Sequence, residues 1–232
     1  RGEPGRVREQ VQASDRWRVT AEGGPMSRYI PPSPFYTFEP LRHDPLDMIP
    51  LIQASQGGDH SEIKAVEGIS ASILSFEEGE KPELDPAMML FLACVAWKKD
   101  GGIPEPLDKG VSRERLGRFP IEGGDALAYV LDNTIEKAEN GLHDLLAKLA
   151  LGLDEEYLGE GGFSQGAGGL ELCGWLDVKE VVILRRAIQR GKWSVDPHEP
   201  LDGGVADVFR HLVIILRGTE KRRCGLMMRR HA

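Results

Sequence analysis

The sequence predicts an α+β fold: a mainly helical single domain with a small antiparallel sheet near the termini. Two amphipathic segments in the last quarter of the chain carry complete start and stop signals for helices. Two short apolar runs, residues 35–38 and 224–228, have the length of strands and lie near the two ends of the domain, so we expect them to pair and to tie these two ends together. With 232 residues and 41% hydrophobic side chains, the chain can bury a sizeable core.

The first residues differ in composition from the rest. Residues 1–26 are rich in Arg, Glu and Gly without a sustained period, so we expect a disordered leader or an upstream extension, with Met26 as a plausible start. The domain then spans residues 27–232. Six prolines between residues 29 and 50 exclude a long helix there, and we expect an irregular segment with a short strand at 35–38.

Two helices are expected before residue 100. From Leu51 to Gly79 the pattern is helical: Asp59 and Glu62 can form a capping box, and apolar residues follow at helical spacing. Asp85-Pro86 is typical of a helix start, and residues 88–97 are apolar on all sides. This second segment is predicted to be the central buried helix, closed by residues 98–102.

The middle of the chain is expected to be a long loop followed by a long helix. Residues 103–124 combine proline, glycine and charge without a period, leaving one short strand near residues 119–121. From Asp125 to Leu149 leucines recur on one stripe, which predicts a single helix kinked at Gly141. His143 is expected on its solvent side.

A helical hairpin is predicted near the C-terminus. Asp177 and Glu180 form a capping box, and Gly191 ends the first helix. The second helix has its apolar residues at i, i+3, i+4 and i+7, and Gly218 is predicted to end it. The proline- and glycine-rich connector should be an exposed loop. The apolar residues of the second helix are Val205, Val208, Phe209, Leu212, Val213 and Leu216.

Charge is distributed unevenly along the chain. The net charge is −8, yet residues 185–232 hold 11 Lys and Arg against 5 Asp and Glu. This basic face either contacts a partner or is complementary to the acidic remainder of the domain. A protein partner is favoured over nucleic acid, because no aromatic residues interleave with the arginines. The candidate binding residues are Arg217, Lys221, Arg222, Arg223, Arg229 and Arg230.

Cysteine usage and hydropathy suggest a compartment. Cys94, Cys173 and Cys224 are odd in number and far apart, which argues for a reducing compartment and against a disulfide framework or a zinc site. The longest apolar run, residues 88–97, is too short to cross a bilayer. The first residues also lack the apolar core of a signal peptide. We therefore expect a cytoplasmic protein without a membrane partner.

The string Gly162-Phe163-Ser164-Gln165-Gly166 resembles the nucleophile elbow of serine esterases of the α/β-hydrolase type. That resemblance implies Ser164 as the nucleophile, with Asp202 and His211 (or Asp196 and His231) completing a triad. The family requires a strand before the serine and a helix after it, whereas glycines lie on both sides here. The alternative interpretation is a flexible, glycine-rich connector.

Acidic and imidazole groups also gather in the connector of the predicted hairpin. Asp196, His198, Glu199 and Asp202 offer cation ligands, but their spacing matches neither an EF-hand nor a zincin helix. Neither a metal nor any other cofactor is predicted.

One further resemblance covers mainly the last hundred residues. The order of Gly57-Gly58-Asp59, the Gly-Leu-His at 141–143, Trp175-Leu176-Asp177 and a final Gly225-Leu226 is similar to uncharacterised bacterial domains of the YfbM-like kind. That family implies no known activity. The sequence thus predicts a non-catalytic binding module, a bacterial regulatory or immunity-type protein that meets its partner through the basic hairpin or the 159–169 loop. The alternative is the serine esterase.

Overall fold

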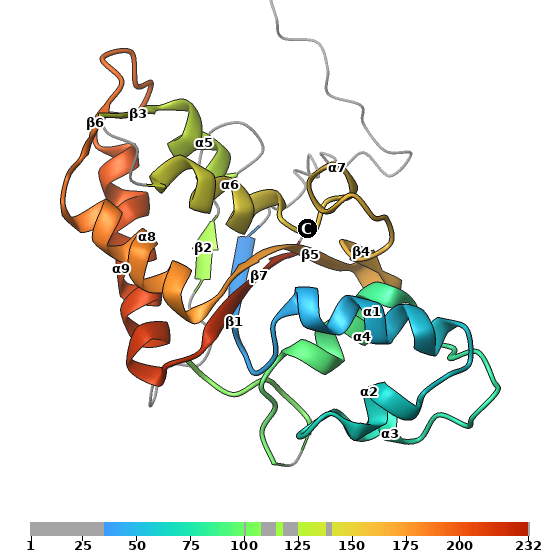
Figure 1. Cartoon of the computed structure of the whole chain (residues 1–232). Coiled ribbons are helices and arrows are strands. Elements are labelled where there is room, and N and C mark those ends of the chain that lie inside the picture. The colour runs from blue at the N-terminus through green and yellow to red at the C-terminus, as the bar shows by residue number, and fades with distance from the viewer. Residues whose placement is uncertain (1–34, 100, 108–114, 118–124, 138–140, 232) are drawn as a thin grey trace, which may run out of the picture. The chain divides into compact units, whose positions relative to one another are not determined.

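The computed structural model describes residues 35–99, 101–107, 115–117, 125–137 and 141–231, which belong to one compact unit (Figure 1). The predicted leader at 1–26 and the predicted strand at 119–121 lie outside the described residues. The described part confirms a mainly helical α+β fold with a small antiparallel sheet. Its strands are β1 (Phe35–Leu41), β2 (Arg115–Gly117), β3 (Thr134–Glu136), β4 (Gln165–Gly166), β5 (Leu170–Leu176), β6 (Trp193–Val195) and β7 (Gly225–His231). Its helices are α1 (Pro45–Gln56), α2 (Ser61–Ala65), α3 (Ala71–Leu74), α4 (Pro86–Cys94), α5 (Ala126–Asp132), α6 (Leu142–Leu151), α7 (Glu155–Leu158), the 3₁₀ turn η2 (Ala167–Gly169), α8 (Val178–Gln189) and α9 (Gly204–Arg222).

The main sheet has the strand order β2-β1-β7-β5-β4, and every neighbouring pair is antiparallel. The last strand of the chain, β7, is therefore the central strand. Phe38 of β1 lies opposite Met228 of β7, which confirms the predicted pairing of the two apolar runs. Both strands are longer than predicted, with seven residues each.

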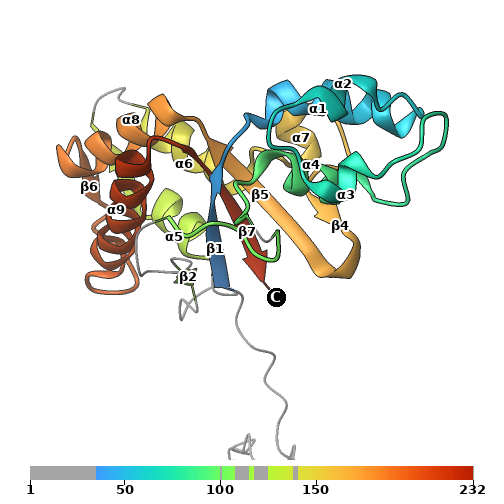
Figure 2. The same ribbon diagram turned by 90° about the horizontal axis from the view of Figure 1, so that it is seen from below.

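Two hydrophobic cores lie on the two faces of this sheet. Successive side chains of a strand point to opposite faces, so Met228 joins one core and Met227 the other. The hairpin core is built on α5, α6, α8 and α9 and contains Leu127, Leu146, Leu184, Leu212 and Met228. The N-terminal core is built on α1 to α4 and contains Ile52, Ile63, Leu90, Trp175 and Met227. Figure 2 shows the two groups of helices on either side of β1, β7 and β5.

The predicted helical hairpin is confirmed. Asp177 accepts hydrogen bonds from the backbone N–H groups of Lys179 and Glu180, and Glu180 accepts one from the Asp177 N–H, which completes the capping box. Helices α8 and α9 pack against each other, and Val205, Phe209 and Leu212 are buried. The apolar faces of the two helices therefore point into the core, as the spacing of their apolar residues predicts.

Two details of the hairpin differ from expectation. Helix α9 does not end at Gly218 but continues to Arg222, because Thr219 still contributes a fully buried side chain and its hydroxyl donates to the Ile215 carbonyl. The connector is not only a loop, since β6 pairs with β3 to form a two-stranded ribbon. The backbone groups of that segment are satisfied by a distant strand, which a local pattern does not reveal.

The C-terminal end of α6 docks directly on β5. A bulge between Leu172 and Gly174 interrupts the ladder, and the Leu153 N–H donates to the Cys173 carbonyl at 2.9 Å. A Cβ atom at Gly174 would lie 1.9 Å from the Lys148 carbonyl oxygen. Only glycine allows this close approach of helix and strand.

The prediction for residues 51–79 was wrong. The first helix begins earlier, at Pro45 after the N-cap Asp44, and includes Pro50. The remaining stretch forms the short helices α2 and α3, and Asp59 bonds the backbone and hydroxyl of Ser61 without capping a long helix. Helix α4 does begin at Asp85-Pro86 as predicted, but it ends at Cys94. Val95 is already extended there and bridges to Leu41 of the sheet.

The single long helix predicted for residues 125–149 was also wrong. It is divided into α5, the strand β3 and α6. Thr134 is a β-branched residue at the start of β3, and Gly141 adopts a left-handed φ of 73° before α6. His143 is half-buried instead of solvated, and its Nε2 lies 2.9 Å from the Thr134 hydroxyl.

Candidate functional site

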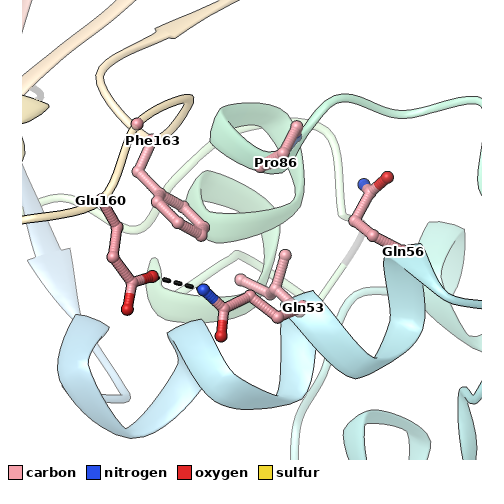
Figure 3. Close-up of a pocket in the computed structure, with 7 residues that line it drawn as sticks. Gln53, Gln56, Pro86, Glu160 and Phe163 are labelled. Carbon is pink, nitrogen blue, oxygen red and sulfur yellow. Dashed lines mark hydrogen bonds between the residues drawn. The ribbon is translucent and has the colours of Figure 1, made fainter.

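A pocket of about 410 Å³ lies between α1, the first turn of α4 and the loop after α7 (Figure 3). Its apolar part comes from Ile52, Pro86, Gly161 and Phe163, and its polar part from Gln53, Gln56 and Glu160. The ring of Phe163 points into the space between the two helices. Such a mixture of an apolar lining and a few polar groups is typical of ligand pockets.

Three elements hold these side chains in place. On α1, Gln56 follows Ile52 by four residues and Gln53 by three, so it lies beside both on the helix surface. On α4, the carboxylate of Asp85 caps the helix by accepting from the Met88 N–H at 2.8 Å, and its second oxygen accepts from the Ala167 N–H at 2.7 Å. The glycine-rich loop is thereby fixed to the start of α4.

The polar groups of the pocket present mostly acceptor atoms. Nε2 of Gln53 donates a hydrogen bond to Glu160, as the dashed line in Figure 3 marks. Nε2 of Gln56 donates to the Leu84 carbonyl at 2.9 Å and to the Met89 sulfur at 3.0 Å. The amide oxygens and the Glu160 carboxylate can only accept. The pocket is therefore suited to a ligand that brings donors.

The charge at the pocket is negative. Glu160 is the single charged side chain among the seven lining residues, and none of the seven is basic. An apolar wall strengthens the field of such a charge inside a cleft. A positive ligand is favoured here.

The seven lining residues include no serine, cysteine, histidine or lysine. A nucleophile with an adjacent base, or a pair of carboxyl groups, is the minimum that acyl or glycosyl transfer requires. The arrangement of this pocket can bind but has no group pair for such chemistry.

Ser164, the predicted esterase nucleophile, lies directly beside this pocket but not on a nucleophile elbow. The two-residue strand β4 follows the serine where the hydrolase motif has a helix, and the described sheet is antiparallel. The Ser164 carbonyl accepts from the Leu172 N–H at 2.7 Å, which ties the loop to β5. Asp202 is exposed just before α9, and His211 is exposed on α9 itself. Helix α9 lies far from β4 in both views (Figures 1 and 2). The structure does not bring the three side chains together.

The predicted binding arginines do not form one face. Arg222 pairs with Glu105 and donates to the Pro106 carbonyl, so it fastens α9 to the 105–106 segment. Arg229 and Arg230 are successive strand residues and point to opposite sides of the sheet. Arg229 lies over the Phe91 ring at 5.2 Å, and Arg230 lies 3.5 Å from Glu171. Arg217, Lys221 and Arg223 are exposed at the end of α9.

The acidic connector before α9 has a structural role. Glu199 accepts from the Val205 N–H at 2.7 Å and from the Tyr129 hydroxyl at 3.0 Å, so it serves the helix start that Gly203 leaves without a side-chain cap. In the described part of the chain, no group of three or more His, Cys, Asp or Glu side chains could hold a metal ion.

Ser55 and His60 form a buried pair that no sequence motif indicates. Ser55 Oγ lies 2.6 Å from His60 Nδ1, and His60 Nε2 lies 2.9 Å from the Glu80 carbonyl. Because a carbonyl can only accept, Nε2 carries a proton and donates it to Glu80. Both side chains are fully buried, so the pair joins the end of α1 to the 76–80 segment and is closed to substrates.

No family model, curated protein or solved structure matches this chain. The likeness to YfbM-like domains stays a prediction. Among the described residues, no helix is both long and apolar enough to span a bilayer.

Proposed function

We propose that this chain is a non-catalytic binding module that contacts another protein through the pocket beside residues 159–163. The observation that carries the proposal is the pocket itself, which combines an apolar lining with acceptor groups held by α1, α4 and the loop. Tyr157, two residues before the loop, is 51% exposed. Exposed tyrosines are enriched in protein interfaces, since they contribute both apolar area and a hydroxyl.

The basic end of α9 is a less suitable contact surface. Arg222, Arg229 and Arg230 are occupied by contacts inside the domain, so reversing their charges would disturb the fold itself. The exposed residues Arg217 and Arg223 remain for testing that surface without this complication.

The test is affinity capture with the full chain as bait and a pocket-blocking variant beside it. Gln53→Trp places a large side chain at the pocket while keeping an exposed helix position, and Ala54→Trp adds the same side chain to the next exposed position of α1, outside the pocket. We expect the first variant to lose most of the protein captured by the parent and the second to retain it. Equal capture by both variants contradicts the proposal. A loss caused instead by Arg217→Glu with Arg223→Glu would transfer the contact to α9.

A further inference from the structure

We infer that the pocket receives the side chain of an arginine from a basic segment of the partner. This inference rests on the proposed function and adds the chemistry of the partner to it. The occupant must bring donors, because the amide N–H groups of Gln56 are already used by Leu84 and Met89 while the Glu160 carboxylate can only accept. Ligands with neutral donor groups would also meet this requirement, so the need for donors does not by itself select a cation.

The charge balance selects a cation among the possible donors. Glu160 belongs to the loop itself and is the single charged side chain of the lining, which contains no basic residue. An acidic or neutral segment gains nothing from this field, whereas a basic segment is both attracted to it and held by it.

The apolar lining selects the shape of that cation. Ile52, Pro86 and Phe163 would cover a hydrocarbon stem, and Glu160 stands at the polar side where the charged head would lie. Arginine and lysine both place an apolar stem under a charged head. Arginine fits better, because its planar fork of five donors can bond a carboxylate and an amide oxygen together.

The test uses blocked heptapeptides of sequence Gly-Ser-Gly-X-Gly-Ser-Gly with the full chain, where X is arginine or its neutral isostere citrulline. Binding is followed by the backbone amide resonances of Gly161 and Gly162 and by the side-chain amide of Gln53. We expect saturable shifts with arginine and at least about tenfold weaker binding with citrulline, since the charge is lost and the shape is kept. Citrulline binding equal to arginine, or no shift with arginine, overturns the inference.

Two isosteric variants locate the charge. Glu160→Gln keeps the hydrogen bond with Gln53 but removes the negative charge, and it should weaken the arginine peptide by at least about fivefold. Glu156→Gln, on the exposed surface of α7, is the matched control and should change binding by less than about twofold. If both variants lose the same affinity for the arginine peptide, the peptide responds to the general negative charge of this surface and not to a site at Glu160.

The peptide test and the capture test fail in different ways. If Gln53→Trp abolishes capture but the arginine peptide does not bind, the binding module stands and its arginine ligand is wrong. If the arginine peptide binds at Gly161 but Gln53→Trp leaves capture unchanged, the pocket has a ligand and the protein partner contacts another surface.

Discussion

At the scale of single residues, the environment of the three cysteines is the clearest feature. Burial raises the pKa of the Cys94 thiol well above its usual value, and Asp44 and Asp47 add to the effect. Burial, followed by the charge of Asp125, raises the pKa of Cys173 to about 12. Burial also raises the pKa of Cys224, with Arg222 acting in the opposite direction. All three thiols are free and none is activated.

Alkylation with iodoacetamide near pH 8 should therefore be slow in the folded protein. The attacking species is the thiolate, and a pKa of about 12 in place of the ordinary 9.0 reduces its fraction at Cys173 by roughly a thousandfold at pH 8. The rate at Cys173 should keep rising with pH beyond about 9, whereas in denaturant all three thiols should follow an ordinary titration. Mass spectrometry of tryptic peptides measures each site. Rapid labelling of folded Cys173 at neutral pH would contradict the raised pKa.

The residues of the pocket show why a site of this kind is invisible in the sequence. Gln53 and Glu160 are 107 positions apart, and neither belongs to a motif. The motif that does stand out, around Ser164, describes five neighbours and says nothing of the strand and helix that the chemistry requires. Its glycines serve instead to fold the loop, with Phe163 buried under it.

At the scale of elements, the predicted helix starts were correct where a capping side chain accompanies the apolar spacing of a helix. Asp85-Pro86 and the Asp177–Glu180 box start α4 and α8 where expected, because these side chains satisfy the first N–H groups of each helix. The 125–149 segment has helical spacing without such signals inside it. There the backbone of β3 finds its partners in β6, about sixty residues away, and tertiary pairing overrides the local period.

The end of α9 offers a direct test of a helix cap. Arg223 closes the helix with a left-handed φ of 57°, and it is the single non-glycine residue with positive φ among those described. This conformation costs a residue with a Cβ atom about 1–2 kcal/mol. Glycine avoids that strain, but it loses more chain entropy on folding, which offsets part of the gain. Arg223→Gly should thus raise the free energy of unfolding by about 0.5–1 kcal/mol in urea titrations.

Arg223→Ala is the matched control for that cap. It removes the same charge and keeps the Cβ atom that causes the strain, so it should not gain stability. If the glycine variant is no more stable than the alanine variant, the cap is not strained.

At the scale of the whole molecule, the position of β7 decides the architecture. The sequence shows that the runs at 35–38 and 224–228 can pair, but not that β5 would add to the other edge of β7 and make the last strand the central one. Each core is closed by one side of this strand. The N-terminal core and the hairpin core are therefore coupled through β7, although no described helix contributes to both.

This coupling predicts that the two cores unfold together. Met227 faces the N-terminal core and Met228 the hairpin core, and both are buried, so alanine at either position should cost roughly 2–5 kcal/mol. Trp175 reports on the N-terminal core, and Trp193, edge-on to Phe209 at 4.6 Å, reports on the hairpin core. Fluorotryptophan NMR during urea titration should show both native signals disappearing at one midpoint, which each methionine variant lowers for both. A shared central strand cannot unfold on one side alone. If Met227→Ala lowers the urea midpoint of the Trp175 signal but leaves that of Trp193 unchanged, the two cores unfold as independent units.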